Sequence, residues 1–325
     1  MSADGFGSGC MGLQICNVKR RRVILILLAG VVAFIVWPGE REPEYQGKKL
    51  SGWLHGALTI AGDDYYPNDQ EQDAVRHIGT NALPCLLKWM CYKRSKLGNR
   101  AAAIAAKLPW GLANTRFITW MRKDKSYYRI RAARTGLAIL GREASPAIPE
   151  LARMAAGSES QMAYAATVAI AVVGEQGFPP ILAAIVNPIH PNRDLAMRLL
   201  VFMKGRGVDV TSAVPAVVGC LQETNAVVAG SAAETLGDLN LKPELSVPAL
   251  GRHVQDPRQP VRVLAVFALA EFEEEARPAV PALIRCLSDA DRGVREDATT
   301  VLRKIAPEIL AKEQGTEKAR SADER

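Results

Sequence analysis

The sequence predicts an all-α solenoid of stacked helix pairs, preceded by a single membrane-spanning helix near the N-terminus. Three observations predict it: few aromatic residues, a proline that recurs about every 33 residues, and one uncharged apolar segment. The 325-residue chain is 48% hydrophobic but only 6% aromatic, which suits close-packed helices better than a β-sandwich. A chain of this length can bury a sizeable core.

The recurring proline defines the repeat. The phrase Ala-x-Pro-Ala-(Ile/Val)-Pro-x-Leu stands at 144–151 and again at 276–283, a separation of 132 residues or four periods of 33. Prolines expected to open a helix are Pro84, Pro149, Pro179, Pro215, Pro248 and Pro281. Their successive spacings are 65, 30, 36, 33 and 33, so we expect a unit within the first interval that has lost its proline, with its second helix near 114–121. A constant period of this length is typical of stacked helix pairs.

Each unit is predicted to contain two helices joined by a short turn. An apolar segment precedes each proline and often ends in glycine, as at Gly141, Gly174 and Gly237. Glycine just past one helix and proline just inside the next is the usual punctuation of such a turn, because the first helical turn has free N–H groups. Apolar residues stand two and six positions after the prolines: Leu86, Leu151, Ile181, Val217, Leu250 and Leu283, then Met90, Ala155, Ile185, Leu221, Val254 and Leu287. These positions share one face of a helix, so each second helix should bury one stripe.

The N-terminal apolar segment, residues 23–37, contains no charged or polar side chain and follows the basic cluster 19–22. Fifteen helical residues span about 22 Å, less than the roughly 30 Å hydrocarbon core, but snorkelling arginines and an interfacial Trp37 could make up the difference. A cleaved signal peptide is the alternative, although no clean Ala-x-Ala site follows the apolar run. We expect a disordered basic tail at 1–22, a transmembrane anchor at 23–38, and the rest of the chain outside the cytoplasm.

Charge and cysteine content exclude little but argue against two classes of protein. The net charge is +7, and the cluster 19–22 supplies four of the positive charges, so the remainder lacks the dense basic face of a nucleic-acid-binding protein. Six cysteines are present without a CxxC pair. We expect the last four to be buried as small hydrophobic residues rather than paired in disulfides: Cys85, Cys91, Cys220 and Cys286.

The period, the proline phrase and the first-helix openings at 260–270 (PVRVLAVFALA) and 293–305 (GVREDATTVLRKI) together resemble bacterial HEAT and HEAT-like repeats of the phycobilisome-lyase type. The resemblance covers about 73–310, or some seven units and a terminal half, and it implies a right-handed α-α superhelix. In this family a Val-Arg pair opens the first helix after an Asp in the preceding turn. The matching pairs are Val75-Arg76, Val261-Arg262 and Val294-Arg295, with Asp256 and either Asp289 or Asp291 as turn partners.

The regions beside the repeats are predicted separately. Residues 39–72 should form a linker and a capping helix with Ser51 as its N-cap and Trp53, Leu54 and Leu58 as its apolar stripe. The tail 311–325 carries charges of both signs and almost no core-forming residues, so we expect it to be disordered.

No motif of a known catalytic or metal site is present. The four histidines, His55, His77, His190 and His253, stand in different units without a companion at ligand spacing. The acidic run of Asp63, Asp64, Asp69, Glu71 and Asp73 lacks the residue order of an EF-hand. We therefore expect no catalytic residue, no cofactor and no metal.

One exposed position of the second helices carries the functional prediction. Four residues after the proline stand Lys88, Arg153, Arg252 and Arg285, with Ala183 and Gly219 in the two intervening units. This position lies about 160° from each of the two buried positions, so it should face solvent. The resemblance implies that second helices line the concave surface, where stacked units would present these basic side chains in a row. Either the row is an ordinary solvated face, or it binds an acidic peptide or protein segment through carboxylate contacts.

The sequence therefore predicts a non-catalytic protein-interaction scaffold anchored in the inner membrane of a bacterium, with its repeats outside the cytoplasm. The bacterial assignment rests on the family resemblance alone. Two alternatives stay open: an enzyme or enzyme accessory, because some related repeats belong to bilin lyases, and a non-specific binder of anionic polymers. No specific nucleic-acid partner is expected.

Overall fold

The computed structural model describes residues 42–59, 66–92, 99–100, 103 and 126–308. The chain divides into two compact units, 1–42 and 43–325, and the described residues belong almost entirely to the second. The expected tail 1–22, the anchor 23–38 and the tail 311–325 lie outside the described residues. Within the described ranges, no helix is both long enough and apolar enough to span a bilayer.

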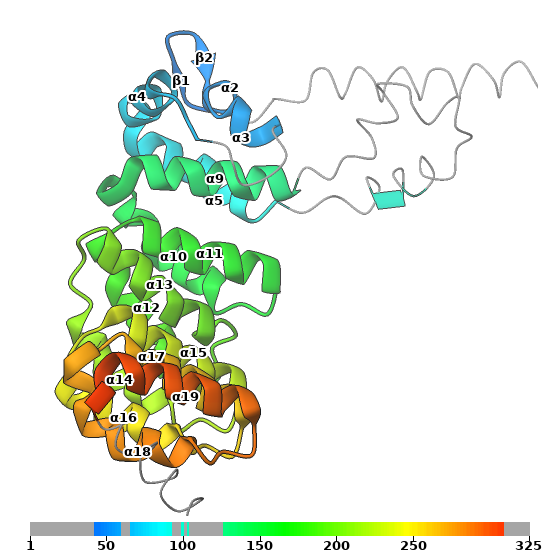
Figure 1. The fold of residues 1–325 in the computed structure, drawn as a ribbon. Helices are drawn as coiled ribbons and strands as arrows, with labels where there is room; N and C mark the ends of the chain where they lie inside the picture. The colour runs from blue at the N-terminus through cyan, green and yellow to red at the C-terminus, as the bar shows by residue number, and fades with distance from the viewer. Residues whose placement is uncertain (1–41, 60–65, 93–98, 101–102, 104–125, 309–325) are drawn as a thin grey trace, which may run out of the picture. The chain divides into compact units, whose positions relative to one another are not determined.

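Paired helices account for nearly all of the described chain (Figure 1). The first helices of successive units are α4 (Asp69–Ile78), α9 (Ser126–Leu140), α11 (Ser160–Val172), α13 (Arg193–Gly205), α15 (Ala226–Leu239), α17 (Gln259–Ala270) and α19 (Arg292–Ile305). The second helices are α5 (Leu83–Met90), α10 (Ile148–Ala155), α12 (Phe178–Val186), α14 (Val214–Cys220), α16 (Pro243–His253) and α18 (Val280–Cys286). Turns of 3-10 helix join the two helices within most units: η1 (Gly79–Ala82), η2 (Gly141–Ala147), η3 (Glu175–Gly177), η4 (Thr211–Ala213) and η5 (Glu273–Ala279).

Successive units stack in the order of the sequence. Each first helix from α9 onward contacts the next first helix, and it also contacts the second helix of the preceding unit, as α11 contacts α10 and α17 contacts α16. One continuous apolar core runs through these contacts. The described chain is therefore an all-α helical-repeat solenoid of HEAT/armadillo-like architecture, as the sequence predicts, while the right-handed superhelix stays a prediction.

The repeat is most regular at the turn between the two helices of a unit. A residue with positive φ ends each first helix at Gly141, Gly174, Gly207, Asn240 and Glu273, so the left-handed turn recurs every 33 residues. The structure corrects the expected helix end at Gly237: α15 continues to Leu239, and the left-handed residue is Asn240. Gly237 is buried inside α15, where it serves a different purpose described below.

The prolines open the second helices, with one exception. Pro84, Pro149, Pro179, Pro215 and Pro281 each occupy the first or second position of their helix. In the remaining unit the helix starts earlier, at Pro243, and Pro248 lies inside α16. The predicted stripe is buried at every position except Leu287, which is half-buried.

The helix pairs before and after the long interval between Pro84 and Pro149 contact each other directly. Helices α4 and α5 both contact α9 directly, in the way that successive pairs contact each other elsewhere. The pairs α4–α5 and α9–α10 are therefore neighbours in the stack, and the expected unit near 92–126 has no layer between them. The predicted second helix at 114–121 lies outside the described residues.

The N-terminal end of the stack is covered by a short hairpin and two short helices, where the sequence predicts one capping helix. Strands β1 (Glu44–Tyr45) and β2 (Lys48–Lys49) pair antiparallel, and α2 (Leu50–Trp53) and α3 (His55–Thr59) follow. Ser51 lies inside α2 and is not its N-cap, because the helix already begins at Leu50. Leu50, Leu54 and Ala57 are fully buried, whereas Trp53 and Leu58 are half-buried. The cap is fixed by the buried Arg131 of α9, whose guanidinium donates to the carbonyl oxygens of Ala57 (3.1 Å) and Gly56 (3.3 Å).

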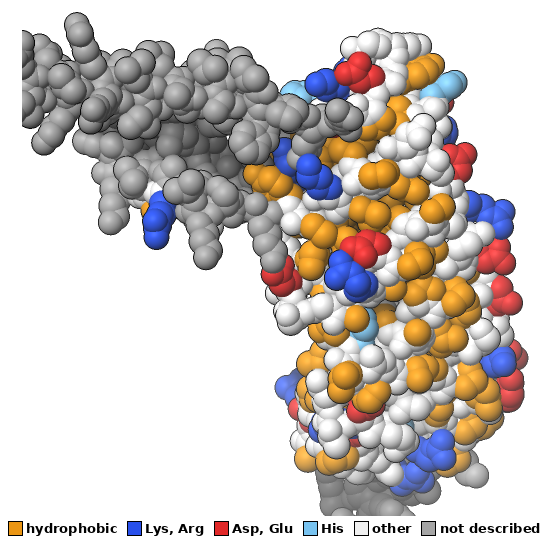
Figure 2. All heavy atoms as spheres, turned by 180° about the vertical axis from the view of Figure 1, so that it is seen from behind, with side chains coloured by type: hydrophobic (Ala, Val, Ile, Leu, Met, Phe, Trp, Pro, Cys, Tyr) orange, Lys and Arg blue, Asp and Glu red, His pale blue; other side chains and the backbone are white. Residues whose placement is uncertain are grey.

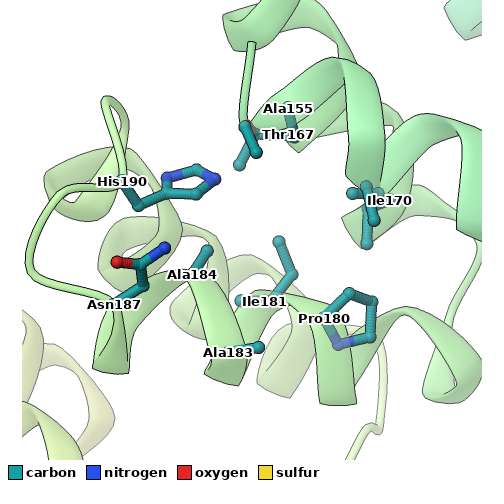
Figure 3. A pocket seen from close by; sticks show the side chains of 11 residues that line it. Ala155, Thr167, Ile170, Pro180, Ile181, Ala183, Ala184, Asn187 and His190 are labelled. Carbon is teal, nitrogen blue, oxygen red and sulfur yellow. The ribbon is translucent and has the colours of Figure 1, made fainter.

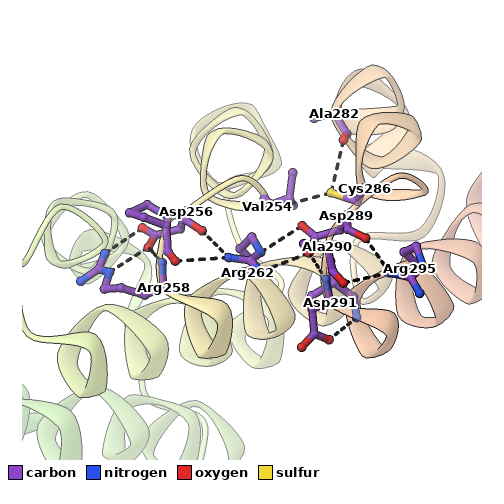
Figure 4. Close-up of polar contacts among 12 residues, drawn as sticks. Val254, Asp256, Arg258, Arg262, Ala282, Cys286, Asp289, Ala290, Asp291 and Arg295 are labelled. Carbon is purple, nitrogen blue, oxygen red and sulfur yellow. Dashed lines mark hydrogen bonds and ion pairs between the residues drawn. The ribbon is translucent and has the colours of Figure 1, made fainter.

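Arginines near the start of the first helices link neighbouring units (Figure 4). Arg262 donates to the backbone oxygen of Asp256 (2.9 Å) and forms an ion pair with the carboxylate of Asp289 (3.0 Å), which belongs to the next turn. Arg295 donates to the backbone oxygen of Asp289 (2.6 Å). Asp291 has another role, since its carboxylate accepts from the N–H of Val294 and caps α19. The turn partners of the arginines are thus Asp256 and Asp289, and not Asp291. The ion pair between Arg262 and Asp289 links one unit to the next.

The family-like pattern fails at the first Val-Arg pair. Arg76 is exposed and contacts side chains of its own helix, through a hydrogen bond to Oε1 of Gln72 (3.2 Å) and an i,i+3 ion pair with Asp73 (3.6 Å). The equivalent role is taken by Arg193 at the start of α13, which the sequence matches only loosely. Arg193 is buried, donates to the carbonyl oxygen of Ile185 (3.0 Å) and pairs with Glu223 of the next unit (2.9 Å).

Candidate functional site

The predicted basic row lies on the exposed side of the second helices. Lys88, Arg153, Arg252 and Arg285 are all exposed, on α5, α10, α16 and α18 respectively. Ala183 on α12 and Gly219 on α14 are exposed at the equivalent positions. We call the surface formed by these six residues and their exposed neighbours on the second helices the second-helix face.

The members of the row differ in their surroundings. Arg153 donates from Nε to the Glu150 carboxylate one helical turn earlier (2.9 Å), although 71% of its side chain stays exposed. The hydrogen bond and charge of Arg153 lower the pKa of the Glu150 carboxyl group. Arg285 lies at the mouth of a polar cavity beside Asp256, Arg262 and Asp289. The positive charge of the row is therefore partly balanced at Arg153.

The middle of the second-helix face is apolar. Around Ala183 and Gly219, the side chains of Leu182 and Val218 are half-buried, and Val186 at the end of α12 is 61% exposed. In the view of Figure 2, hydrophobic side chains gather in a broad band along the described helices, with a few charged side chains within it. On the second-helix face, basic residues of the row stand in the units before and after this apolar centre.

A cavity of about 180 Å³ opens within this apolar centre, between α10 and α12 (Figure 3). Its walls come mainly from small residues on the two helices and from Ile170 and Thr167 on α11. The alanines that line it are Ala152, Ala155, Ala156, Ala183 and Ala184. Helices α12 and α14 pack against each other, as do α14 and α16. Alanine side chains are too short to fill the equivalent space between α10 and α12, which leaves the cavity.

The polar groups of the cavity come from the loop after α12. His190 extends from this loop toward Thr167 (Figure 3), and Asn187 stands beside it. The Thr167 hydroxyl donates to the Ala163 carbonyl oxygen (2.8 Å). The backbone N–H of Asn192 donates to Nδ1 of His190 (3.2 Å), so in the neutral ring the proton is on Nε2. Burial, with a smaller contribution from Arg193, lowers the pKa of His190 and favours this neutral form.

Several of the histidines and acidic residues of the sequence form hydrogen bonds within the fold. Glu71 completes a capping box with Asn68 at the start of α4, through reciprocal bonds of 2.9 and 3.0 Å. His77 and His253 each bond through Nδ1 to the carbonyl oxygen four residues earlier. Within the described ranges, no group of three His, Cys, Asp or Glu residues is placed to hold a metal ion. Asp63 and Asp64 lie outside those ranges.

Three of the four cysteines are buried as predicted: Cys85, Cys220 and Cys286. Cys91 is exposed, because α5 ends at Met90 and the buried stripe ends with it. None of the four forms a disulfide. Burial raises the pKa of the Cys286 thiol to about 11, so this side chain behaves as a small apolar residue.

The sequence does not predict the cavity or the position of His190 beside it. Two features of the sequence are related to them. Alanines cluster at both ends of the short 30-residue interval between Pro149 and Pro179. The next interval is longer, at 36 residues, and its extra residues form the loop that bears His190. Neither feature gives the separation of α10 and α12, which depends on packing across units.

No protein-family model matches the chain, and no curated protein matches it in sequence. Solved structures match at low similarity. An engineered protein is 16% identical, with 79% of this chain and 73% of that chain covered and a TM-score of 0.38. Human deoxyhypusine hydroxylase in complex with glycerol is 17% identical, with 80% and 96% covered and a TM-score of 0.34. A designed armadillo repeat protein in complex with the peptide (KR)4 is 15% identical, with 79% and 99% covered and a TM-score of 0.32.

The likeness is one of repeat architecture. At these TM-scores the structures do not superpose closely, and no property of theirs is carried to this chain. The assignment of a helical-repeat solenoid rests on the helix pairs and contacts described above.

Proposed function

We propose that this protein is a non-catalytic interaction scaffold that binds an acidic peptide or protein segment along its second-helix face. The observation that carries the proposal is the composition of this face: exposed basic side chains at both ends and an apolar centre with an open cavity. Arginine favours carboxylate partners because its planar guanidinium can make two parallel hydrogen bonds.

The spacing of the row suggests what kind of segment fits. Packed helices lie about 8–10 Å apart, and an extended chain advances about 3.3 Å per residue. Side chains about three residues apart in a bound extended segment can therefore reach the row positions of neighbouring units. Lys88 and Arg153 lie in neighbouring units, as do Arg252 and Arg285, and three unit steps separate Arg153 from Arg252. The fitting segment has an acidic pair at each end and about eight residues between the pairs.

The scaffold is proposed to act at a membrane. The uncharged segment 23–37, with the basic cluster 19–22 before it, would anchor the chain, and the positive-inside rule would place the repeats outside the cytoplasm. By its resemblance to bacterial repeats, we propose the inner membrane of a bacterium, with the repeats in the periplasm. An enzyme or enzyme accessory and a non-specific binder of anionic polymers are the alternatives that the test must separate.

The test is a binding titration with the full-length protein in detergent micelles. The probe is a fluorescent peptide of about fifteen residues, in which two glutamates three residues apart stand at each end of an otherwise uncharged chain. We expect saturable binding that Arg153→Glu, Arg252→Glu and Arg285→Glu together weaken at least about tenfold, because three attractive contacts become repulsive.

The control variant carries the same change of charge away from the row, at the exposed residues Arg142, Arg277 and Arg303. It should bind the probe as the unmodified protein does, and both variants should keep the helical circular dichroism. A non-specific polyanion binder would behave differently in two ways. Both variants would lose affinity for the probe equally, and the unmodified protein would bind polyglutamate of random length as tightly as the probe, with a steep dependence on salt. Failure of the unmodified protein to bind the probe would overturn the proposal.

A further inference from the structure

We infer that the cavity between α10 and α12 is an anchor pocket, which takes one aliphatic side chain of leucine or methionine size from the bound segment. The inference rests on the proposed function and adds a specificity to it: an aliphatic residue must stand next to the acidic residue that contacts Arg153. Position links the two, since Ala152 lines the cavity and Arg153 is the next residue of α10.

The size and lining of the cavity fit an apolar side chain. Its volume is about 180 Å³, and a cavity of about 150 Å³ lined by aliphatic and aromatic side chains holds a benzene-sized group. Ile170 and Ile181 form the floor together with alanine methyl groups, and both isoleucines are buried. A charged or strongly hydrated side chain would lose its water there without gaining enough hydrogen bonds.

Two large hydrophobic side chains are exposed in the chain next to the cavity lining. Val186 is 61% exposed and Ile189 is 87% exposed, and they are the chain neighbours of the lining residues Asn187 and His190. Single exposed hydrophobic residues are common on protein surfaces. Two large ones in one short loop next to lining residues of an apolar cavity are surface that a bound segment would cover.

One polar group gives the pocket a direction. His190 presents Nε2–H toward the cavity, because its Nδ1 already accepts the N–H of Asn192. A donor in an otherwise apolar site orients its ligand. The natural acceptor is a backbone carbonyl oxygen of the bound segment, next to the residue whose side chain enters the cavity.

Charge complementarity selects the occupant. The row carries cationic side chains on both sides of the cavity, and the carboxylate of Glu150 is already paired with Arg153. An aliphatic residue preceded or followed by glutamate or aspartate can place its side chain in the cavity and its neighbour's carboxylate at Arg153. A basic or uncharged apolar segment would fill the cavity but lose that contact.

The test compares two peptides on the full-length protein. Both keep the acidic pairs of the probe described above, and the residue next to each pair, on the side toward the centre of the peptide, is a leucine in one peptide and an alanine in the other. We expect the leucine peptide to bind at least about tenfold more tightly, since burying even small apolar groups in a fitting pocket gives discrimination of that order.

The decisive variant is Ala183→Leu, which fills the mouth of the cavity from an exposed position of α12. It should abolish the preference for leucine while leaving the arginine-dependent binding of the alanine peptide. Gly219→Leu is the matched control, because it changes the equivalent position of α14, where no atom lies within 4 Å of an added Cβ. This variant should keep the preference.

Each outcome separates the inference from the proposed function. If the two peptides bind equally well through the arginines, the anchor pocket is overturned and the scaffold survives. A leucine preference that persists in Ala183→Leu also overturns the pocket. If neither peptide binds the unmodified protein, both the pocket and the proposed function fail.

Discussion

At the scale of single residues, the repeat is maintained by backbone conformation more strictly than by residue identity. The left-handed turn recurs every 33 residues, yet its occupant changes from glycine to Asn240 and then to Glu273. Asparagine tolerates positive φ because its short polar side chain can bond locally, whereas glutamate has no such compensation. Glu273, at φ 48°, is therefore the least suitable occupant of these turns, and the surrounding packing holds it there.

Replacing Glu273 by glycine should stabilise the protein by about 1 kcal/mol, because glycine adopts positive φ without steric cost. The only ion pair in which Glu273 takes part within the described chain is a long contact with Lys304 at 3.9 Å, so little is lost. The measurement is the thermal unfolding midpoint by circular dichroism. Glu274→Gly is the control: Glu274 is exposed and has negative φ, so the same change there should be neutral or destabilising. A lower midpoint for Glu273→Gly would contradict the explanation.

At the scale of helices, small residues set how closely neighbouring units approach. Gly237 on α15 faces α17, and a Cβ built on it would lie 2.8 Å from the Cα of Ala268. Between α10 and α12, five alanines line a cavity because their side chains are too short to fill the space. Small side chains thus have opposite effects, allowing contact where backbones approach and leaving space where they do not.

Gly237→Ala should destabilise the protein by about 1–3 kcal/mol, because the added methyl group must separate α15 from α17. Gly219→Ala should be neutral or stabilising by up to about 1 kcal/mol, since alanine favours the helix and its Cβ meets no atom within 4 Å. Urea unfolding of the two variants, each compared with the unmodified protein, measures the difference. Similar losses in both would show that the close α15–α17 approach is not what selects glycine.

At the scale of the whole molecule, arginines tie consecutive units together. Arg131, Arg193 and Arg262 each reach a carbonyl oxygen or carboxylate outside their own helix, and the latter two pair with an acidic side chain of the following unit. These contacts are buried or nearly so, and losing one partner of such a pair costs more than losing a surface pair. The stack is thus held by polar links between units as well as by its apolar core.

The proposed anchor makes a prediction about the whole chain. Fusing alkaline phosphatase, which is active only outside the bacterial cytoplasm, after residue 325 should give an active and membrane-bound enzyme, because under this proposal the basic cluster 19–22 keeps the N-terminus inside. Replacing residues 19–22 by serine should lower that activity. Release of the fusion into the soluble fraction would indicate cleavage of the apolar segment instead of anchoring.

The helical repeat, its period and the buried stripe of the second helices follow from the sequence alone, because these features depend on glycine and proline at helix ends and on helical periodicity. The sequence also placed the four basic residues of the row at exposed positions. It failed where a local signal fits two structures: Gly237 is typical of a helix end but lies inside α15, and Pro248 is typical of a helix start but also lies inside its helix, α16.

How neighbouring units meet depends on contacts that the sequence does not specify locally. Helix α5 contacts α9 directly, and an ion pair joins Arg262 to Asp289 of the next turn. The cavity between α10 and α12 is likewise lined by residues that are distant in the sequence. Periodicity specifies which face of a helix is buried, but not what covers it. The distance between two helices depends on the fit of side chains from both, and that fit created the cavity beside Arg153.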